Sequence, residues 1–177
     1  MMDQLKYPIG KFQKPASYTP ELLADCIKVI ESFPAKLRME VERLSNEQLD
    51  TPYRAQGLTI RQVVNHCADS HMNSLTRFKL ALTEDKPIIK PYHEELWAEL
   101  ADSTHIPVAP ALLMLEGLHQ RWVVLLKSLT TDDLKKCFVH PEHGREIPLD
   151  ETIATYAWHC MHHLAHITML KQSKNWN

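Results

Sequence analysis

The chain has 177 residues, of which 44% are hydrophobic and 24% charged, and its formal net charge is −2. This length suits one domain with a substantial core, and the small net charge excludes a strongly basic surface of the kind that binds nucleic acid or an anionic membrane. Eleven histidines, against only four glycines, are the unusual feature, because histidine is a common metal ligand that titrates near neutral pH.

Signals that would direct the chain into or across a membrane are missing from the sequence. The opening residues contain no apolar segment typical of a signal peptide, and no apolar run reaches the roughly 18 residues of a membrane span. The four cysteines are far apart and form no C-x-x-C motif, which fits free thiols in a reducing compartment. We therefore expect a cytoplasmic protein with no membrane partner.

The chain begins with a predicted arm followed by a helix. Residues 1–18 contain two prolines and a glycine, so we expect an irregular arm that packs on a single domain formed by residues 19–177. Thr19 and Pro20 are typical of a helix start. We expect this helix to continue to about residue 44, with a kink or break at Pro34.

A second long helix follows a loop. Thr59 and Gln62 have the spacing of a capping box, and apolar residues then recur at helical spacing, which predicts a helix over about 60–82. Two proline-containing loops come next, with a short helical piece between them around Trp97.

The second half of the chain predicts two more long helices. The first covers about 111–129, and one or two helical turns and a hairpin or loop around His143-Gly144 come after it. Asp150 is the expected cap of the last helix, which should reach about Gln172. Four long helices predict an all-α, antiparallel four-helix bundle with a small irregular or hairpin insertion before the last helix.

The last helix contains the cluster "WHCMHHLAHI", in which four histidines fall within eight residues. At 100° per residue they share one arc of the helix. His159 and His163 lie nearest the apolar stripe and should face the bundle, whereas His162 and His166 should face its flank. Two histidines one turn apart can bind the same zinc ion. The alternative from spacing alone is a set of partly exposed histidines without a metal.

A third ligand should come from a different helix. The second helix offers His71, which falls within its apolar stripe, and His66, which falls at the edge and continues into a polar line. Spacing does not choose between them, since His71 could also be a hydrogen-bonded core residue. The cluster lacks the glutamate of the H-E-x-x-H motif, so the zincin class of metalloprotease is excluded.

Five blocks of sequence resemble the YfiT-like proteins of the DinB-like superfamily. In chain order they are "YPIGKF", "DTPYR", "RQVVNHCADSHMNSLTRFKLALTE", "LHQRWVVLL" and "WHCMHHLAHI". The resemblance covers nearly the whole chain. It implies a four-helix bundle, a homodimer and one divalent ion per subunit, zinc or nickel, with His66, His159 and His163 as ligands. This choice of His66 over His71 comes from the resemblance alone.

The resemblance implies a metal-dependent hydrolase acting on a small molecule. A divalent ion bound by three histidines would lower the pKa of a bound water from about 15.7 to about 7. Asp69 is a candidate base or partner of a ligand, His162 is a candidate for proton transfer, and Arg77 and His166 are weaker candidates.

Two alternatives stay open at this point. Other members of the superfamily transfer low-molecular-weight thiols such as bacillithiol, mycothiol or glutathione, because the ion can deprotonate a coordinating thiol. The chain could also be a metal-binding bundle without turnover. The sequence does not identify the substrate.

Overall fold

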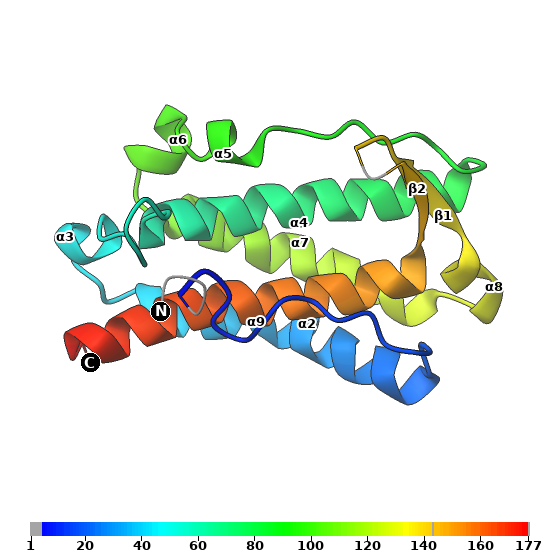
Figure 1. Cartoon of the computed structure of the whole chain (residues 1–177), viewed down its shortest axis with the longest axis horizontal. Helices are drawn as coiled ribbons and strands as arrows, with labels where there is room; N and C mark the ends of the chain where they lie inside the picture. The colour runs from blue at the N-terminus through cyan, green and yellow to red at the C-terminus, as the bar shows by residue number, and fades with distance from the viewer. Residues whose placement is uncertain (1–4, 143, 177) are drawn as a thin grey trace.

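Four long helices run side by side in the computed structural model, which describes residues 5–142 and 144–176 (Figure 1). They are α2 (Pro20–Val41), α4 (Ile60–Thr83), α7 (Ala109–Ser128) and α9 (Leu149–Lys174). The connections contain α3 (Asn46–Leu49), α5 (Glu94–Trp97), α6 (Ala101–Thr104), α8 (Thr131–Lys135), β1 (Cys137–His140) and β2 (Arg145–Pro148). The predicted four-helix bundle is confirmed, and its insertion is a hairpin. The predicted turn residue His143 and the first four residues of the predicted arm lie outside the described ranges.

The helix starts show which local predictions were correct. Thr59 and Gln62 form the predicted capping box, in which each side chain accepts a hydrogen bond from the other residue's backbone N–H. Pro34 neither ends nor divides α2, which continues through it with the proline ring buried in the core. The predicted cap at Asp150 was wrong, because α9 already begins at Leu149 and Asp150 lies in its first turn.

The helices form a square in which the neighbours of α2 are α7 and α9, and the neighbours of α4 are also α7 and α9. Contacts between their side chains give the directions. Arg38 pairs with Glu116 and Glu31 pairs with Lys127, so α2 and α7 are antiparallel.

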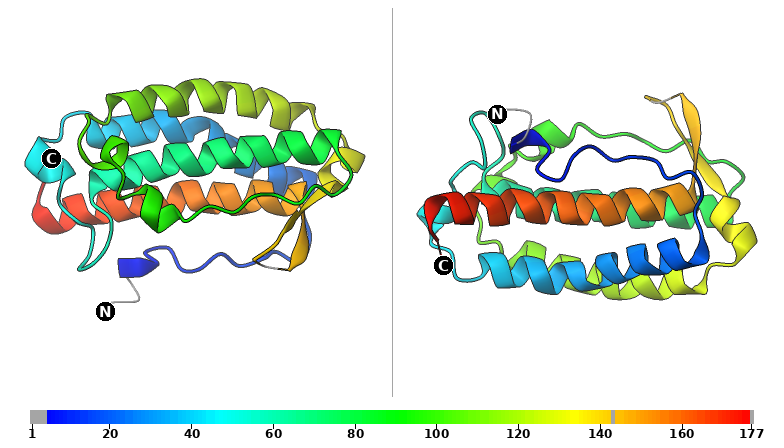
Figure 2. Two further views of the ribbon diagram at one scale, coloured as in Figure 1. Left: turned by 90° about the horizontal axis from the view of Figure 1, so that it is seen from above. Right: turned by 60° about the horizontal axis from the view of Figure 1, so that its bottom comes forward.

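The direction of α4 relative to its neighbours follows in the same way. The ring contacts His71–His119 and Phe78–Trp122 make α4 and α7 parallel. Contacts of Ser70 with Tyr156 and of His66 with His163 make α4 and α9 antiparallel. Adjacent helices are therefore parallel in some pairs and antiparallel in others, because residues 84–108 return along the bundle before α7 begins (Figures 1 and 2). The expected four-helix bundle is present, but the expectation that all of its neighbouring helices are antiparallel was wrong.

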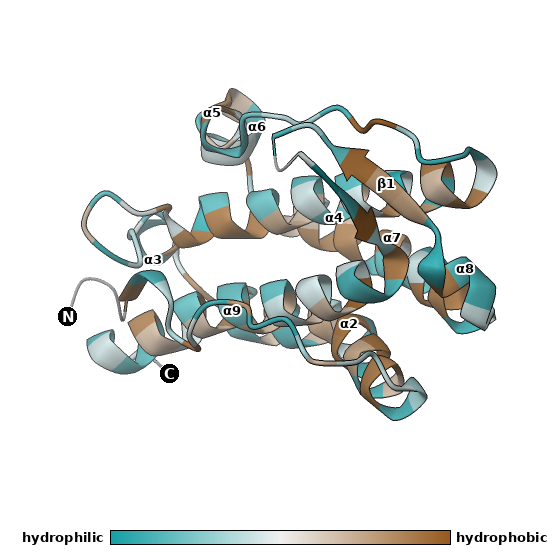
Figure 3. Ribbon diagram, turned by 45° about the vertical axis from the view of Figure 1, so that its right-hand side comes forward, coloured by the Kyte–Doolittle hydropathy of each residue, from teal (hydrophilic) through white to brown (hydrophobic). Residues whose placement is uncertain are grey.

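The hydrophobic faces of the four helices meet in one core, as the brown inner faces in Figure 3 show. Its largest fully buried side chains include Ile30, Phe33, Leu37, Phe78, Leu115, Trp122, Ile153 and Ile167. The four cysteines are free thiols, of which three are buried. Among the described residues no helix is both long and apolar enough for a membrane span.

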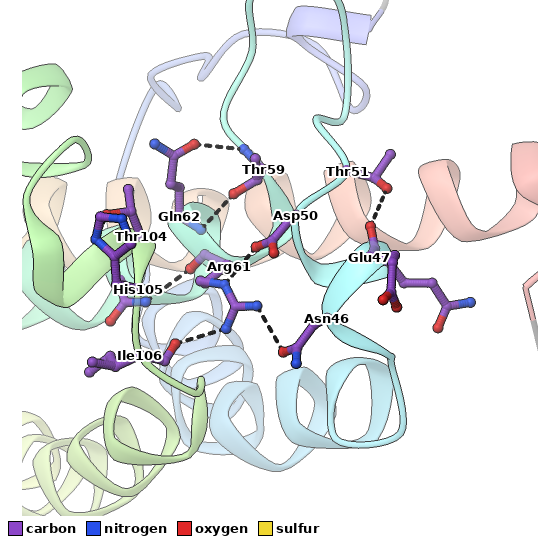
Figure 4. A network of polar contacts seen from close by, with 12 residues as sticks. Asn46, Glu47, Asp50, Thr51, Thr59, Arg61, Gln62, Thr104, His105 and Ile106 are labelled. Atoms are coloured by element: carbon purple, nitrogen blue, oxygen red, sulfur yellow. Dashed lines mark hydrogen bonds and ion pairs between the residues drawn. The ribbon is translucent and has the colours of Figure 1, made fainter.

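Arg61 fixes the start of α4. Its side chain is buried, and its guanidinium donates hydrogen bonds to Asp50 Oδ1 at 2.6 Å, Asn46 Oδ1 at 3.0 Å and the Ile106 carbonyl at 2.8 Å (Figure 4). Gln62 reaches the same long connection through the Ala98 carbonyl at 2.9 Å. These bonds tie α3 and the 84–108 segment to the first turn of the helix that also carries His66.

The arm runs along α9 (Figure 2). The Trp158 indole N–H donates to the Gly10 carbonyl at 3.1 Å, and Lys14 pairs with the buried carboxylate of Glu151 at 2.8 Å. Gly10 has a φ of 78°, a conformation that glycine adopts without steric cost. The arm therefore covers the flank of α9 on which the outer histidines lie.

Candidate metal centre

Three histidines meet where the second turn of α4 faces the middle of α9. His66 comes from α4, and His159 and His163 lie one turn apart on α9. Their ligand atoms all lie within 4.8 Å of one another, and His66 Nε2 is 3.3 Å from His159 Nε2. Two nitrogen ligands at the usual 2.0–2.1 Å from a tetrahedral zinc ion are separated by about 3.3 Å. The spacing of these imidazoles fits one ion.

Burial keeps the three imidazoles neutral. It lowers the pKa of His66 to about 4 and moves the pKa values of His159 and His163 well below their ordinary range, and the neighbouring histidines add to both of the latter shifts. His66 is 7% exposed and His163 9% exposed. A neutral imidazole offers a lone pair, which is the form that a metal ion requires.

His162 and His166 occupy the flank of the cluster. The ring of His162 stacks on Trp158 with centroids 4.5 Å apart, and the ring of His166 stacks on Tyr53 at 3.9 Å. His166 Nε2 also donates to the Lys6 carbonyl at 3.2 Å. Both residues are buried. The arm and the loop before α4 cover them, and they do not point into the bundle interior.

These two histidines also form a second candidate group with His163, again within 4.8 Å. We favour the group with His66 for two reasons. It joins two helices, and the aromatic and backbone contacts of His162 and His166 already hold those rings in place.

His71 lies behind the three ligands, in the bundle interior. Its Nε2 is 3.1 Å from His159 Nδ1, and its Nδ1 is 2.8 Å from His119 Nε2 of α7. The ring is fully buried against Phe33 and Trp122. Of the two roles weighed for His71 from the sequence, the structure places it as the hydrogen-bonded core residue.

Two cavities reach His159. The larger, of about 640 Å³, extends toward the hairpin and is lined by Tyr156, Arg77 and Arg145. The smaller, of about 410 Å³, lies under the arm and is lined by His66, His163 and the outer histidines. Glu94 and Glu95 of α5 line both. A small molecule can therefore approach His159 from the larger cavity and all three histidines from the smaller one.

Of the polar residues predicted around the site, Arg77 and His162 line a cavity that reaches His159, and Asp69 does not. Arg77 is half-buried in the wall of the larger cavity. Asp69 lines neither cavity that reaches His159. Burial, together with the nearby Asp102, raises the pKa of its carboxyl to about 6. His162 lines the smaller cavity, and burial lowers its pKa to about 4, so it is neutral at pH 7.

Two residues of the site were missed by the sequence analysis. Glu94 lies in a loop-like stretch whose place over the cluster depends on how residues 84–108 return along the bundle. His119 is a single histidine among Leu115, Trp122 and Val123. Its apolar neighbours were a usable signal, because a polar ring in such a stripe must find a partner inside the core.

Comparison with known proteins adds independent findings. The pattern of the DinB superfamily matches residues 30–167. Proteins from Bacillus cereus (strain 03BB102) and Bacillus thuringiensis subsp. konkukian, both carrying the name "Putative metal-dependent hydrolase", are each 54% identical over 175 residues, covering 99% of this chain and all of theirs. A solved structure, YfiT from Bacillus subtilis, is described as a probable metal-dependent hydrolase with an unusual four-helix bundle topology. Its sequence is 46% identical to this chain, and the two structures superpose with a TM-score of 0.96 over 98% of this chain and 99% of YfiT.

Proposed function

The chain belongs to the DinB superfamily, and we propose that it is a metal-dependent hydrolase of a small molecule, with His66, His159 and His163 as the metal ligands. The observation that carries the proposal is the convergence of these three neutral imidazoles, which all line the cavity of about 410 Å³, while His159 also lines the cavity of about 640 Å³. The names of the relatives point to the same activity. Zinc is the proposed ion, because a set of three histidines is typical of catalytic zinc, and nickel is the alternative.

A bound divalent ion of this kind supplies a water nucleophile at neutral pH and polarises the bond to be broken. The chain's own residues do the rest. Arg77 offers its guanidinium to an anionic group of the substrate from the wall of the larger cavity. The arm covers the outer histidines, where Trp158 of α9 and Tyr7 of the arm contact His162.

A general base must accept the proton that water loses. Glu94 lines both cavities, and its pKa is raised by desolvation and by the nearby Glu95. Asp69 is the second candidate and His162 the third. The pH–rate profiles of Glu94→Gln and Asp69→Asn distinguish the first two, since only loss of the true base removes the acid limb of the profile.

Metal content tests the proposal directly. The protein is loaded with zinc, and the bound metal of wild type, His66→Ala, His159→Ala and His163→Ala is measured by mass spectrometry. We expect about one zinc per wild-type subunit and loss of zinc in each variant. His105→Ala, which changes an exposed histidine, is the matched control. Stoichiometric zinc in all three variants would overturn the ligand assignment.

Thiol transfer is the second candidate function, because His159 lines two cavities that could hold a thiol and an electrophile separately. An assay with a nitrophenyl ester and with an epoxide, each with and without bacillithiol or glutathione, separates the two. Turnover without thiol supports the hydrolase, whereas strict thiol dependence supports the transferase. A chain that binds zinc but turns over neither is the non-catalytic alternative.

We also propose that the protein is a homodimer. Leu113 and Val124 of α7 are 64% and 71% exposed, and a second copy of the chain would remove them from water. Light scattering should give the mass of a dimer for wild type and of a monomer for Val124→Glu. A monomeric wild-type protein would contradict this.

A further inference from the structure

A chain of hydrogen bonds leads from the metal centre through all four helices. His159 Nδ1 on α9 is 3.1 Å from His71 Nε2 on α4. His71 Nδ1 is 2.8 Å from His119 Nε2 on α7, and His119 Nδ1 is 2.7 Å from the backbone carbonyl of Ile30 on α2. We refer to this set, His159, His71, His119 and the Ile30 carbonyl, as the histidine relay.

The backbone carbonyl at the far end fixes the direction of every bond in the relay. A carbonyl oxygen only accepts, so His119 must donate from Nδ1, and a neutral imidazole then has only a lone pair on Nε2. His71 must therefore donate to His119 from Nδ1, which leaves a lone pair on His71 Nε2. By the same reasoning His159 donates from Nδ1 to His71.

The consequence reaches the metal centre. With its proton on Nδ1, His159 has its lone pair on Nε2, the atom that lies 3.3 Å from His66 Nε2. If the donor and acceptor of each hydrogen bond were exchanged, His159 Nε2 would carry a proton and could not bind an ion. The Ile30 carbonyl thus selects, through two intervening rings, the tautomer that metal binding needs.

We propose that His71 and His119 are positioning residues that hold His159 in its Nδ1–H tautomer and fix the orientation of its ring toward the metal. The proposal rests on the metal centre proposed above and adds two residues that bind neither metal nor substrate. Many metal-binding histidines donate directly to a carboxylate or a carbonyl, whereas here two further imidazoles separate the ligand from the carbonyl.

Among the described residues, the rings of His71 and His119 have no hydrogen-bond partner outside the relay. His71 is 0% exposed and His119 2% exposed. Phe33, Trp122 and Tyr156 pack against the ring of His71, and none of the described carboxylates is hydrogen-bonded to either ring. Because no acid lies within the relay, it sets proton positions without adding negative charge to the ligand.

Nuclear magnetic resonance tests the relay in the wild-type protein. Long-range proton–nitrogen spectra of protein labelled at histidine nitrogens distinguish a protonated Nδ1 from a protonated Nε2, in the metal-free and the zinc-loaded form. We expect the Nδ1–H tautomer at His71, His119 and His159. An Nε2–H tautomer at His71 or His119 overturns the proposal, and this result does not depend on whether the protein hydrolyses anything.

Substitutions test the consequence for metal binding. We expect His71→Leu to weaken zinc binding by about 10- to 100-fold in a chelator competition, with a smaller loss for His119→Leu, which leaves the His159–His71 bond in place. Phe33→Leu is the matched control, because it disturbs the packing of both rings without removing a hydrogen bond.

The results separate the relay from the metal centre. A folded His71→Leu protein with wild-type zinc affinity overturns the positioning role, and so does a loss equal to that of Phe33→Leu. If His71→Leu does not fold, the tautomers of His71 and His119 in the wild-type protein still test the proposal. A wild type that binds no zinc but has the expected tautomers contradicts the proposed function and leaves the hydrogen-bonded relay intact.

Discussion

Arg61 has a buried positive charge whose three hydrogen bonds reach two separate segments of the chain, α3 with its C-cap and the connection that contains Ile106. Arg61→Met removes these bonds and leaves the Ile106 carbonyl without its donor, so we expect the free energy of unfolding to fall by about 2–4 kcal/mol. Arg61→Lys should recover little of this, because one ammonium cannot reproduce the geometry of a guanidinium fork. Denaturant unfolding of the metal-free protein measures both.

The control for this prediction is Arg121→Met, which changes an exposed arginine of α7. It should alter the free energy of unfolding by no more than about 0.5 kcal/mol. If Arg61→Met were equally mild, the three hydrogen bonds would contribute no net stability.

Single residues also show how far the sequence could predict the site. The helical wheel separated His159 and His163 from His162 and His166, because a phase of 100° per residue is a local property. The wheel could not choose between His66 and His71. His71 lies within the apolar stripe of α4 and His66 at its edge, and a histidine in either position can be a metal ligand or a hydrogen-bonded core residue. That choice depends on which residues α7 and α9 present, and only the packed bundle shows it.

At the scale of elements, the arm is held to α9 mainly near Trp158. This side chain donates to the Gly10 carbonyl, stacks on His162 and contacts Phe12. Trp158→Leu removes interactions worth about 1.4 kcal/mol, so the population with a detached arm should rise about tenfold. Trypsin cleavage after Lys11 and Lys14 measures this population and should accelerate by a similar factor.

Trp176→Leu is the matched control, because Trp176 packs on the core near the end of α9. It should leave cleavage of the arm unchanged. An unchanged rate in Trp158→Leu as well would mean that the contacts of Trp158 do not hold the arm.

Helix boundaries were more predictable than helix directions. The capping box at Thr59 and Gln62 marks a start that neighbouring residues determine completely. The parallel arrangement of α4 and α7 has no such local cause. Residues 84–108 must span the length of a helix, about 36 Å, and their extended length is more than sufficient for this. The same number of residues could also have formed a wide loop at one end of the bundle, so the length of this connection does not predict the direction of α7.

At the scale of the whole molecule, seven histidines within the described residues share one property, which is a pKa lowered by burial. They are His66, His71, His119, His159, His162, His163 and His166. In the folded metal-free protein all seven are neutral at pH 7. In the unfolded chain each titrates near 6.5, so the two states bind the same number of protons above that pH and different numbers below it.

This difference sets the pH dependence of stability. As the pH falls below about 6.5, the unfolded chain takes up protons that the folded protein does not, and the free energy of unfolding must fall until the folded pKa values, about 4 for His66, His119, His162 and His166, are reached. Each histidine contributes up to about 1.4 kcal/mol per pH unit. We therefore expect a plateau of stability above pH 7 and a steep loss between pH 6.5 and 4.

Denaturant unfolding of the metal-free protein at pH 8, 7, 6 and 5 measures the slope. His166→Leu removes one of the buried groups and should reduce the slope between pH 6 and 5 by about 1.4 kcal/mol per pH unit at most. His105→Ala removes an exposed histidine and should leave it unchanged. Stability that is flat or rising as the pH falls from 7 to 5 would mean that the histidines are already charged in the folded state.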